Sequence, residues 1–86
     1  MSNEIEKEYE IAVQKINEIL KMSDDDKLYL YARYKQIQKG DNNEPKPSFY
    51  KIVEKAKWNA WMDLKGMTKE NAMIEYTKKA KEYISF

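Results

Sequence analysis

Apolar residues recur three and four positions apart over most of the 86-residue chain, with charged residues between them. This spacing matches the 3.6-residue period of amphipathic α-helices and not the two-residue period of strands. The first helix is expected from about Asn3 to Lys21. Its apolar stripe comprises Ile5, Tyr9, Ala12, Val13, Ile16, Ile19 and Leu20. With only two glycines and two prolines, the chain is also poor in the residues of a turn-rich β fold.

The second predicted helix has clear signals at both ends. Ser23 can accept a hydrogen bond from a backbone amide of the first turn, and Asp24–Asp26 suit the positive end of the helix dipole. The helix is expected to run to about Lys39 and to stop at Gly40, a residue type common just beyond helix ends.

Two further helices complete the predicted fold. The third is expected from about Ser48 to Lys65, and it ends at Gly66. Its stripe comprises Phe49, Ile52, Val53, Ala56, Ala60, Trp61 and Leu64. The fourth begins after Thr68, and its stripe comprises Ala72, Met73, Tyr76, Ala80, Tyr83 and Ile84. We therefore expect one all-α domain over residues 1–86.

The segment between the second and third helices, GDNNEPKP (Gly40–Pro47), has no periodicity and is expected to be a loop. Antiparallel neighbours need only about 2–5 connecting residues. Eight extended residues reach roughly 27 Å, whereas a sixteen-residue helix is about 24 Å long. The loop can therefore cross the length of the bundle and let the third helix run parallel to the second.

The second helix is apolar or aromatic nearly all the way round, through Leu28, Tyr29, Leu30, Tyr31, Ala32, Tyr34 and Ile37. Such a helix is either central or covered on a second face. Lys35 nevertheless falls inside its apolar arc, and Lys57 falls inside the apolar arc of the third helix. Each of these two helices is thus expected to carry one lysine on its apolar face.

Two interpretations of these lysines stay open from the residues alone. Each lysine can cover apolar surface with its methylenes while its ammonium reaches water. Alternatively, Lys35 and Lys57 bind one anion together with the Tyr31 hydroxyl, since lysine binds phosphate as a point charge. Tyr76 similarly fits either core packing or a platform for a purine ring. Trp58 and Trp61 are expected in the core.

Composition excludes several kinds of chemistry. The chain has no cysteine and no histidine, which removes disulfides, thiol and imidazole catalysis and the usual zinc ligands. Sixteen basic residues are interleaved with fifteen acidic ones, so nucleic-acid binding is not expected. No apolar run is long enough to span a bilayer. The aspartates at Asp24–Asp26 are expected to be a solvated first turn rather than a metal site.

Two blocks of the sequence resemble the acyl-CoA-binding protein family. LYLYARYKQIQKGD (Leu28–Asp41) is similar to the family's second helix, and KAKWNAWMDLKGMTKENAMIEY (Lys55–Tyr76) to its third and fourth helices, including the paired tryptophans. The spacing between the blocks also fits. The resemblance implies a four-helix bundle of up-down-down-up topology, with an overhand crossover between the second and third helices.

The resemblance further implies a non-catalytic, cytoplasmic, monomeric carrier of long-chain acyl-CoA that needs no metal or cofactor. It implies no stable membrane insertion, and exchange of the ligand with acyl-CoA-using enzymes or membranes. The adenosine 3′-phosphate would be held by Tyr31, Lys35 and Lys57, and Tyr76 would contact the ligand. Tyr34 and Leu28 would line the same pocket.

The first helix matches the family only by its periodicity, and Lys15 and Asn17 are both candidates for a ligand contact. Met22 and the pair Ile37–Gln38 depart from the family pattern, so the preferred acyl length stays undetermined. A second hypothesis is a protein-interaction module, in which the second apolar face of the second helix receives a partner helix.

Overall fold

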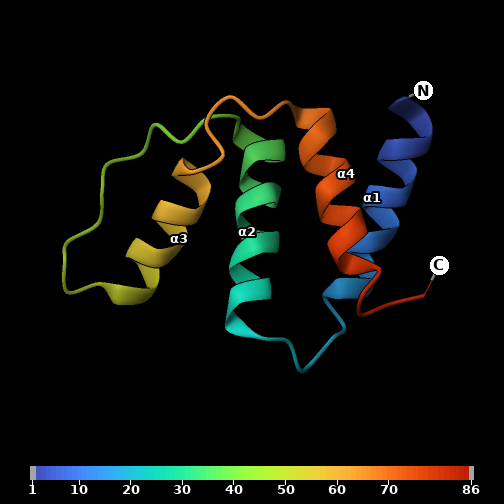
Figure 1. Ribbon diagram of the computed structural model, residues 1–86, viewed down its shortest axis with the longest axis horizontal. Coiled ribbons are helices and arrows are strands. Elements are labelled where there is room, and N and C mark those ends of the chain that lie inside the picture. The colour runs from blue at the N-terminus through green and yellow to red at the C-terminus, as the bar shows by residue number, and fades with distance from the viewer. Residues whose placement is uncertain (1, 86) are drawn as a thin grey trace.

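The computed structural model describes residues 2–85, apart from the side chains of Ser2 and Asn3. Within this range the secondary structure consists of four α-helices and contains no strand. The helices are α1 (Ser2–Ile16), α2 (Asp24–Lys39), α3 (Ile52–Met62) and α4 (Lys69–Ala80) (Figure 1). The predicted all-α class is confirmed. None of the helices in the described range is long and apolar enough to cross a membrane.

The chain follows the predicted up-down-down-up path (Figure 1). α2 and α3 run in the same direction, and α1 and α4 run opposite to them. The connection from α2 to α3 passes along the outer side of α3 for the length of that helix. The loop after α2 is therefore the crossover connection that its length was expected to permit.

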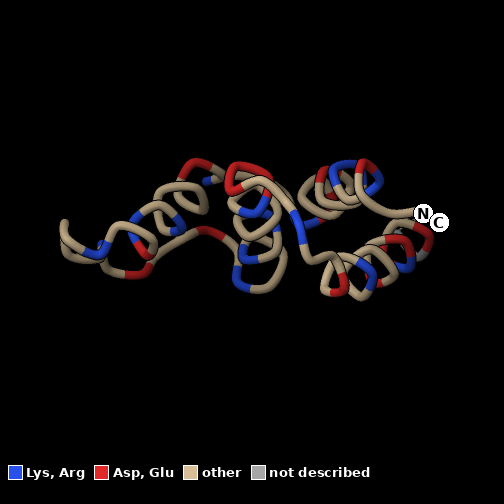
Figure 2. Tube along the Cα trace, turned by 90° about the horizontal axis from the view of Figure 1, so that it is seen from below, with Lys and Arg blue, Asp and Glu red and all other residues tan. Residues whose placement is uncertain are grey.

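The four helices form an open row rather than a closed square. α2 lies between α3 and α4, and α4 lies between α2 and α1 (Figure 1). Among the described residues, the backbones of α1 and α2 do not approach each other closely, and neither do those of α3 and α4. The molecule is accordingly flat, with principal extents of 39 × 29 × 14 Å, as the view turned by 90° shows (Figure 2). This arrangement leaves space between α1 and α2.

Both predicted N-caps are confirmed. The Ser23 hydroxyl accepts a hydrogen bond from the Asp26 amide, and the Thr68 hydroxyl accepts one from the Asn71 amide, both at 3.1 Å. Gly40, at the end of α2, has φ of 79°, a conformation that side chains disfavour and glycine adopts easily. Local residue chemistry thus sets these helix ends.

Two helices are shorter than the sequence predicts. α1 ends at Ile16 and not near Lys21, because the chain tightens into three-residue turns there: the Glu18 amide donates to the Lys15 carbonyl at 3.1 Å. Leu20, predicted on the apolar stripe, is instead exposed in the connection to α2. The prediction was wrong here because the apolar spacing continues through Ile19 and Leu20, whereas the backbone leaves the helix at Ile16.

α3 spans Ile52–Met62 and not the predicted Ser48–Lys65. A separate turn precedes it, closed by the Lys51 amide and the Ser48 carbonyl at 3.0 Å. The first part of its predicted stripe is not core, and the exposed residues are Phe49, Ile52 and Val53. α3 packs on α2 alone, so the residues at its start have no neighbouring element to bury them.

The main core joins α1, α2 and α4, and its buried members are Tyr9, Ala12, Leu30, Ile37, Ala72, Met73, Tyr76 and Ala80. A smaller core of Ala32, Trp61 and Leu64 joins α2 to α3. α2 contributes to both cores because its two apolar faces meet different helices. Tyr83 and Ile84 lie beyond α4 but continue its turn, and Ile84 packs against the main core.

Candidate ligand-binding site

The interface between α2 and α3 brings the two suspect lysines together with two aromatic rings. The Lys57 ammonium lies 5.2 Å from the centre of the Tyr31 ring, and the Lys35 ammonium lies 5.0 Å from the centre of the Trp61 ring. Tyr31 and Lys35 are one turn apart on α2, and Lys57 and Trp61 are one turn apart on α3. The parallel helices therefore pair a lysine with a ring at two successive levels.

Neither of these lysines is neutralised. Within residues 2–85, no carboxylate lies within ion-pairing distance of Lys35 or Lys57. Lys35 is half-buried and Lys57 is exposed, so both ammonium groups remain available to a ligand from solvent. Two ammonium groups thus lie at one interface, where each contacts an aromatic ring and neither forms an ion pair with a described carboxylate.

Tyr31 adds a neutral polar group to this interface. Its side chain is half-buried, and its hydroxyl makes no hydrogen bond with any described residue. Burial raises the pKa of Tyr31, with a smaller contribution from the Glu44 carboxylate. The phenol therefore stays protonated at neutral pH and can donate to an anion.

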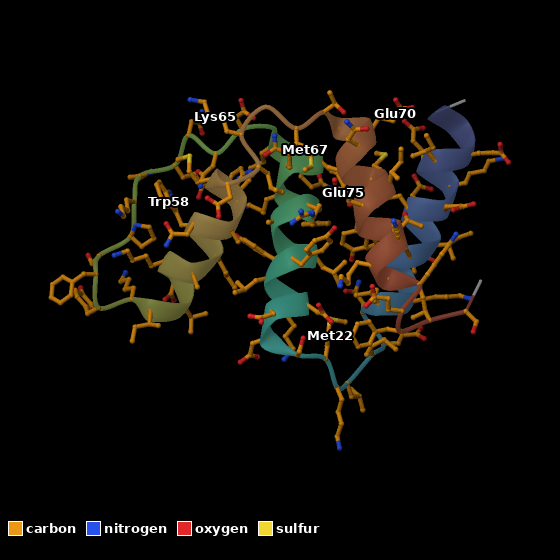
Figure 3. The ribbon with its side chains drawn as sticks, in the orientation of Figure 1. Met22, Trp58, Lys65, Met67, Glu70 and Glu75 are labelled. Carbon is orange, nitrogen blue, oxygen red and sulfur yellow. The ribbon has the colours of Figure 1, made fainter. Side chains whose placement is uncertain are left out.

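A cleft of about 410 Å³ opens beside Tyr31, where the end of α1 and the following turn face α2. Apolar and aromatic side chains dominate its walls, and the lining residues are Val13, Ile16, Asn17, Ile19, Met22, Lys27, Leu30, Tyr31, Tyr34 and Tyr76. Met22, at the turn between α1 and α2, lies near the lower rim in Figure 3. The space left between α1 and α2 is thus a concave, mostly apolar site.

Tyr76 belongs to the core and to this cleft at once. Its side chain is buried and packs edge-to-face against Tyr9, with ring centres 5.2 Å apart. Burial, followed by the nearby Tyr34, raises the pKa of Tyr76 to about 12. Core packing and ligand contact were alternatives from the sequence, but the geometry makes them compatible.

A second cleft, of about 440 Å³, lies between α3 and the crossover loop. It is lined by Tyr31, Glu44, Pro45, Lys46, Pro47, Ser48, Lys51, Glu54, Trp58 and Trp61. Tyr31 is shared by both clefts. The lysine-bearing interface therefore adjoins both clefts through Tyr31, although neither Lys35 nor Lys57 lines either of them.

The two tryptophans hold the crossover loop in place. The Trp61 indole donates to the Gly40 carbonyl and the Trp58 indole donates to the Glu44 carbonyl, each at 2.8 Å. Trp61 is buried as predicted, but Trp58 is only half-buried and points from α3 toward the loop (Figure 3). The wall of the second cleft thus depends on both indoles.

Sequence reasoning missed the polar residues that fix the loop. Buried Asn42 donates to the Trp58 carbonyl at 3.1 Å and accepts from the Glu44 amide at 2.9 Å. The Asp41 carboxylate accepts from the Gly66 amide at 2.9 Å, which together with Gln36 lowers the pKa of Asp41. The only signal available was the presence of Asp and Asn in a loop, which is common in turns of every kind.

The remaining candidates are placed as follows. Leu28 is half-buried on the same face of α2 as Tyr31 and Lys35, but it lines neither cleft. Of the two candidates on the first helix, Asn17 lines the first cleft and Lys15 bonds to the Ser85 carbonyl. Lys27, which sequence reasoning did not single out, also lines the first cleft. In the described part of the chain, no group of acidic residues could hold a metal ion.

A family model described as "Acyl CoA binding protein" matches residues 6–80, nearly the whole chain. The chain belongs to the acyl-CoA-binding protein family. The Saccharomyces cerevisiae acyl-CoA-binding protein is 42% identical over 69 residues, which cover 79% of each chain. The crystal structure of Oryza sativa acyl-CoA-binding protein 2 superposes with a TM-score of 0.84 at 33% identity, covering 91% of this chain and 88% of that one.

Other relatives of this chain are larger or carry other names. Rattus norvegicus diazepam-binding inhibitor-like 5 is 42% identical over 76 residues, 87% of each chain. Danio rerio acyl-CoA-binding domain-containing protein 6 is 38% identical over 74 residues, and this chain covers only 25% of its length. Sequences similar to this chain therefore occur both in proteins of about its length and within longer ones.

Proposed function

We propose that this protein is a non-catalytic carrier of long-chain acyl-CoA esters, whose adenosine 3′-phosphate is held by Tyr31, Lys35 and Lys57. The observation that carries the proposal is the pair of lysines without carboxylate partners at the α2–α3 interface. A phosphate of charge near −2 would offset the repulsion between two ammonium groups, and the Tyr31 hydroxyl would donate a further hydrogen bond.

Tyr34 and Tyr76 give the first cleft aromatic walls directly beside Tyr31. Purine rings stack well on such side chains, so we place the adenine in this cleft. Leu28, on the face of α2 that carries Tyr31 and Lys35, would begin the apolar path of the acyl chain. Burial of that chain would add roughly 0.8 kcal/mol per methylene group.

A carrier role fits the groups that the clefts offer. The chain has neither histidine nor cysteine, and the two carboxylates that line the second cleft, Glu44 and Glu54, are exposed beside lysines. General acid–base chemistry needs carboxylates whose surroundings separate their protonation states. We accordingly propose a monomeric, cytoplasmic carrier without a cofactor, which exchanges acyl-CoA with enzymes or membranes.

The alternative function, a module that receives a partner helix on the second apolar face of α2, has less support. α4 covers one face of α2, and α3 covers the other through Tyr31, Ala32 and Trp61. The face that the sequence left without an assigned neighbour is occupied by α3 of the same chain. An external helix would have to displace α3.

Isothermal titration calorimetry with palmitoyl-CoA, free coenzyme A and palmitate tests the proposal. We expect palmitoyl-CoA to bind most tightly and palmitate to bind weakly or not at all. Lys35→Ala and Lys57→Ala should each weaken binding at least tenfold, about 1.4 kcal/mol. Lys55→Ala is the matched control on α3, because Lys55 contacts neither ring; equal binding of palmitoyl-CoA and palmitate would overturn the proposal.

A further inference from the structure

The start of α3 carries a group of apolar side chains that the fold leaves in solvent. Phe49 is 83% exposed, Tyr50 67%, Ile52 76% and Val53 62%. We refer to these four residues as the apolar tip. They lie where the crossover loop turns into α3, at the end of the molecule farthest from α1 (Figure 1). Isolated exposed apolar residues are ordinary, but four within five positions form a patch.

The exposure of the apolar tip follows from how the chain is built there. The turn between the Ser48 carbonyl and the Lys51 amide orients the segment before α3 begins. The Phe49 and Tyr50 rings pack against each other, 5.8 Å apart and perpendicular, instead of against the core. The row of helices ends at α3, so no helix lies beyond it, and the crossover loop on its outer side leaves these side chains exposed.

Positive charge surrounds the apolar tip. Lys46, Lys51 and Lys55 lie within a few residues of it, and Glu54 is the acidic residue among them. No carboxylate lies within ion-pairing distance of these three lysines in the part of the chain that the structure describes. Figure 2 shows basic and acidic positions together at this end of the molecule, and within residues 46–55 three lysines stand against one glutamate. The apolar tip and the unpaired lysines around it therefore suit a partner that offers an apolar interior beneath negatively charged groups.

We propose that the apolar tip is a peripheral docking site for a lipid bilayer containing anionic lipids. Aromatic and aliphatic side chains that enter the headgroup region, flanked by lysines, are the composition of interfacial membrane contacts. A stable protein dimer needs roughly 800 Å² per partner, more than four side chains supply. The lysines, moreover, would repel those of a second copy brought face to face.

Docking at this site would also place the second cleft next to the membrane. Lys51, beside the apolar tip, and Trp58, two turns further along the chain, both line that cleft. An acyl-CoA leaving the bilayer would then have a short path to Tyr31, a consequence that rests on the proposed function. Docking itself needs no bound ligand, so the two proposals can fail separately.

Vesicle co-sedimentation without ligand tests the proposal. The protein is mixed with vesicles of phosphatidylcholine alone or of phosphatidylcholine with phosphatidylserine, at low and high salt. We expect binding to the anionic vesicles that weakens as salt screens the lysines. The double variant Phe49→Ser/Ile52→Ser should bind at least about tenfold more weakly, since two large apolar side chains would no longer be buried.

Leu20→Ser is the matched control, because Leu20 is 94% exposed on the α1–α2 connection, away from the apolar tip. It should bind vesicles like the unaltered protein, and circular dichroism should show all variants folded. No vesicle binding, or equal binding by the double variant, would overturn the proposal. So would concentration-dependent dimers that the double variant abolishes, or a loss in that variant of palmitoyl-CoA affinity in solution, which would assign the tip to the acyl groove.

Discussion

The ammonium of Lys57 lies 5.2 Å from the centre of the Tyr31 ring, across the interface between two parallel helices. One turn further along both helices, Lys35 and Trp61 repeat the arrangement with the lysine on the opposite helix. The aromatic faces stabilise the two ammonium groups without neutralising them. Under the proposed function, a ligand phosphate would neutralise this pair of positive charges.

The Tyr31 hydroxyl should matter separately from the ring. Tyr31→Phe keeps the ring under Lys57 and is expected to weaken palmitoyl-CoA binding by about 0.5–1.5 kcal/mol, the usual range for one hydrogen bond. Tyr31→Ala removes the ring as well and should weaken binding further. Calorimetric titration measures both, with the exposed Tyr50→Phe as control. Unchanged affinity in Tyr31→Phe would show that the phenol does not donate to the ligand.

Asn42 should stabilise the crossover loop far more than its neighbour does. Asn42 is buried and bonded to the Trp58 carbonyl and the Glu44 amide, whereas Asn43 is exposed. Asn42→Ala is expected to lower the free energy of unfolding by about 1–3 kcal/mol, because it removes both hydrogen bonds of this buried side chain. Urea unfolding should show little change for Asn43→Ala. Equal effects of both changes would contradict this account of the loop.

The buried tyrosines should make the fold sensitive to alkali. Burial raises the pKa of Tyr9, with smaller contributions from Tyr76 and Tyr34, and the pKa of Tyr76 is raised to about 12. An unfolded tyrosine ionises near pH 10. The stabilisation from the two neutral phenols is therefore complete below about pH 10 and is lost as pH rises toward 12. Urea unfolding at a series of alkaline pH values measures this loss.

Tyr9→Phe tests which phenol is responsible. The Tyr9 hydroxyl is buried and has no partner at hydrogen-bond geometry among the described residues. The nearby Gln38 side chain lowers the pKa of Tyr9, but by less than burial raises it. Removing this hydroxyl should leave stability at neutral pH unchanged or slightly higher, because no bond is lost. The decline above about pH 10 should become shallower. A marked loss of stability at neutral pH would mean that the hydroxyl is bonded.

Much of the fold was predictable because its signals are local. Ser23 and Thr68 mark helix starts through their own hydroxyl groups, and Gly40 marks an end through its backbone freedom. The ends at Ile16 and Ile52 were missed, since an apolar stripe does not reveal where the backbone turns. The exposure of Phe49 depends on which helices are neighbours, a tertiary property that periodicity does not contain.

The candidate site divides in the same way. Lys35 and Lys57 stood out in the sequence because each interrupts an apolar arc, and the family resemblance supplied the identity of the ligand that they and the nearby tyrosines were expected to bind. The pairing of each lysine with a ring on the other helix required the register of α2 against α3. Asn42 gave no distinctive signal, because its burial arises only when the loop closes against Trp58.

The central claim is that Lys57 binds the 3′-phosphate of an acyl-CoA. Its most direct test is a double-mutant cycle between protein and ligand, in which calorimetry compares palmitoyl-CoA with its 3′-dephospho analogue in the unaltered protein and in Lys57→Ala. We expect the unaltered protein to lose at least tenfold in affinity when the phosphate is removed, about 1.4 kcal/mol. Lys57→Ala should lose much less. Equal losses in both proteins would contradict the account, because the lysine and the phosphate would then act independently.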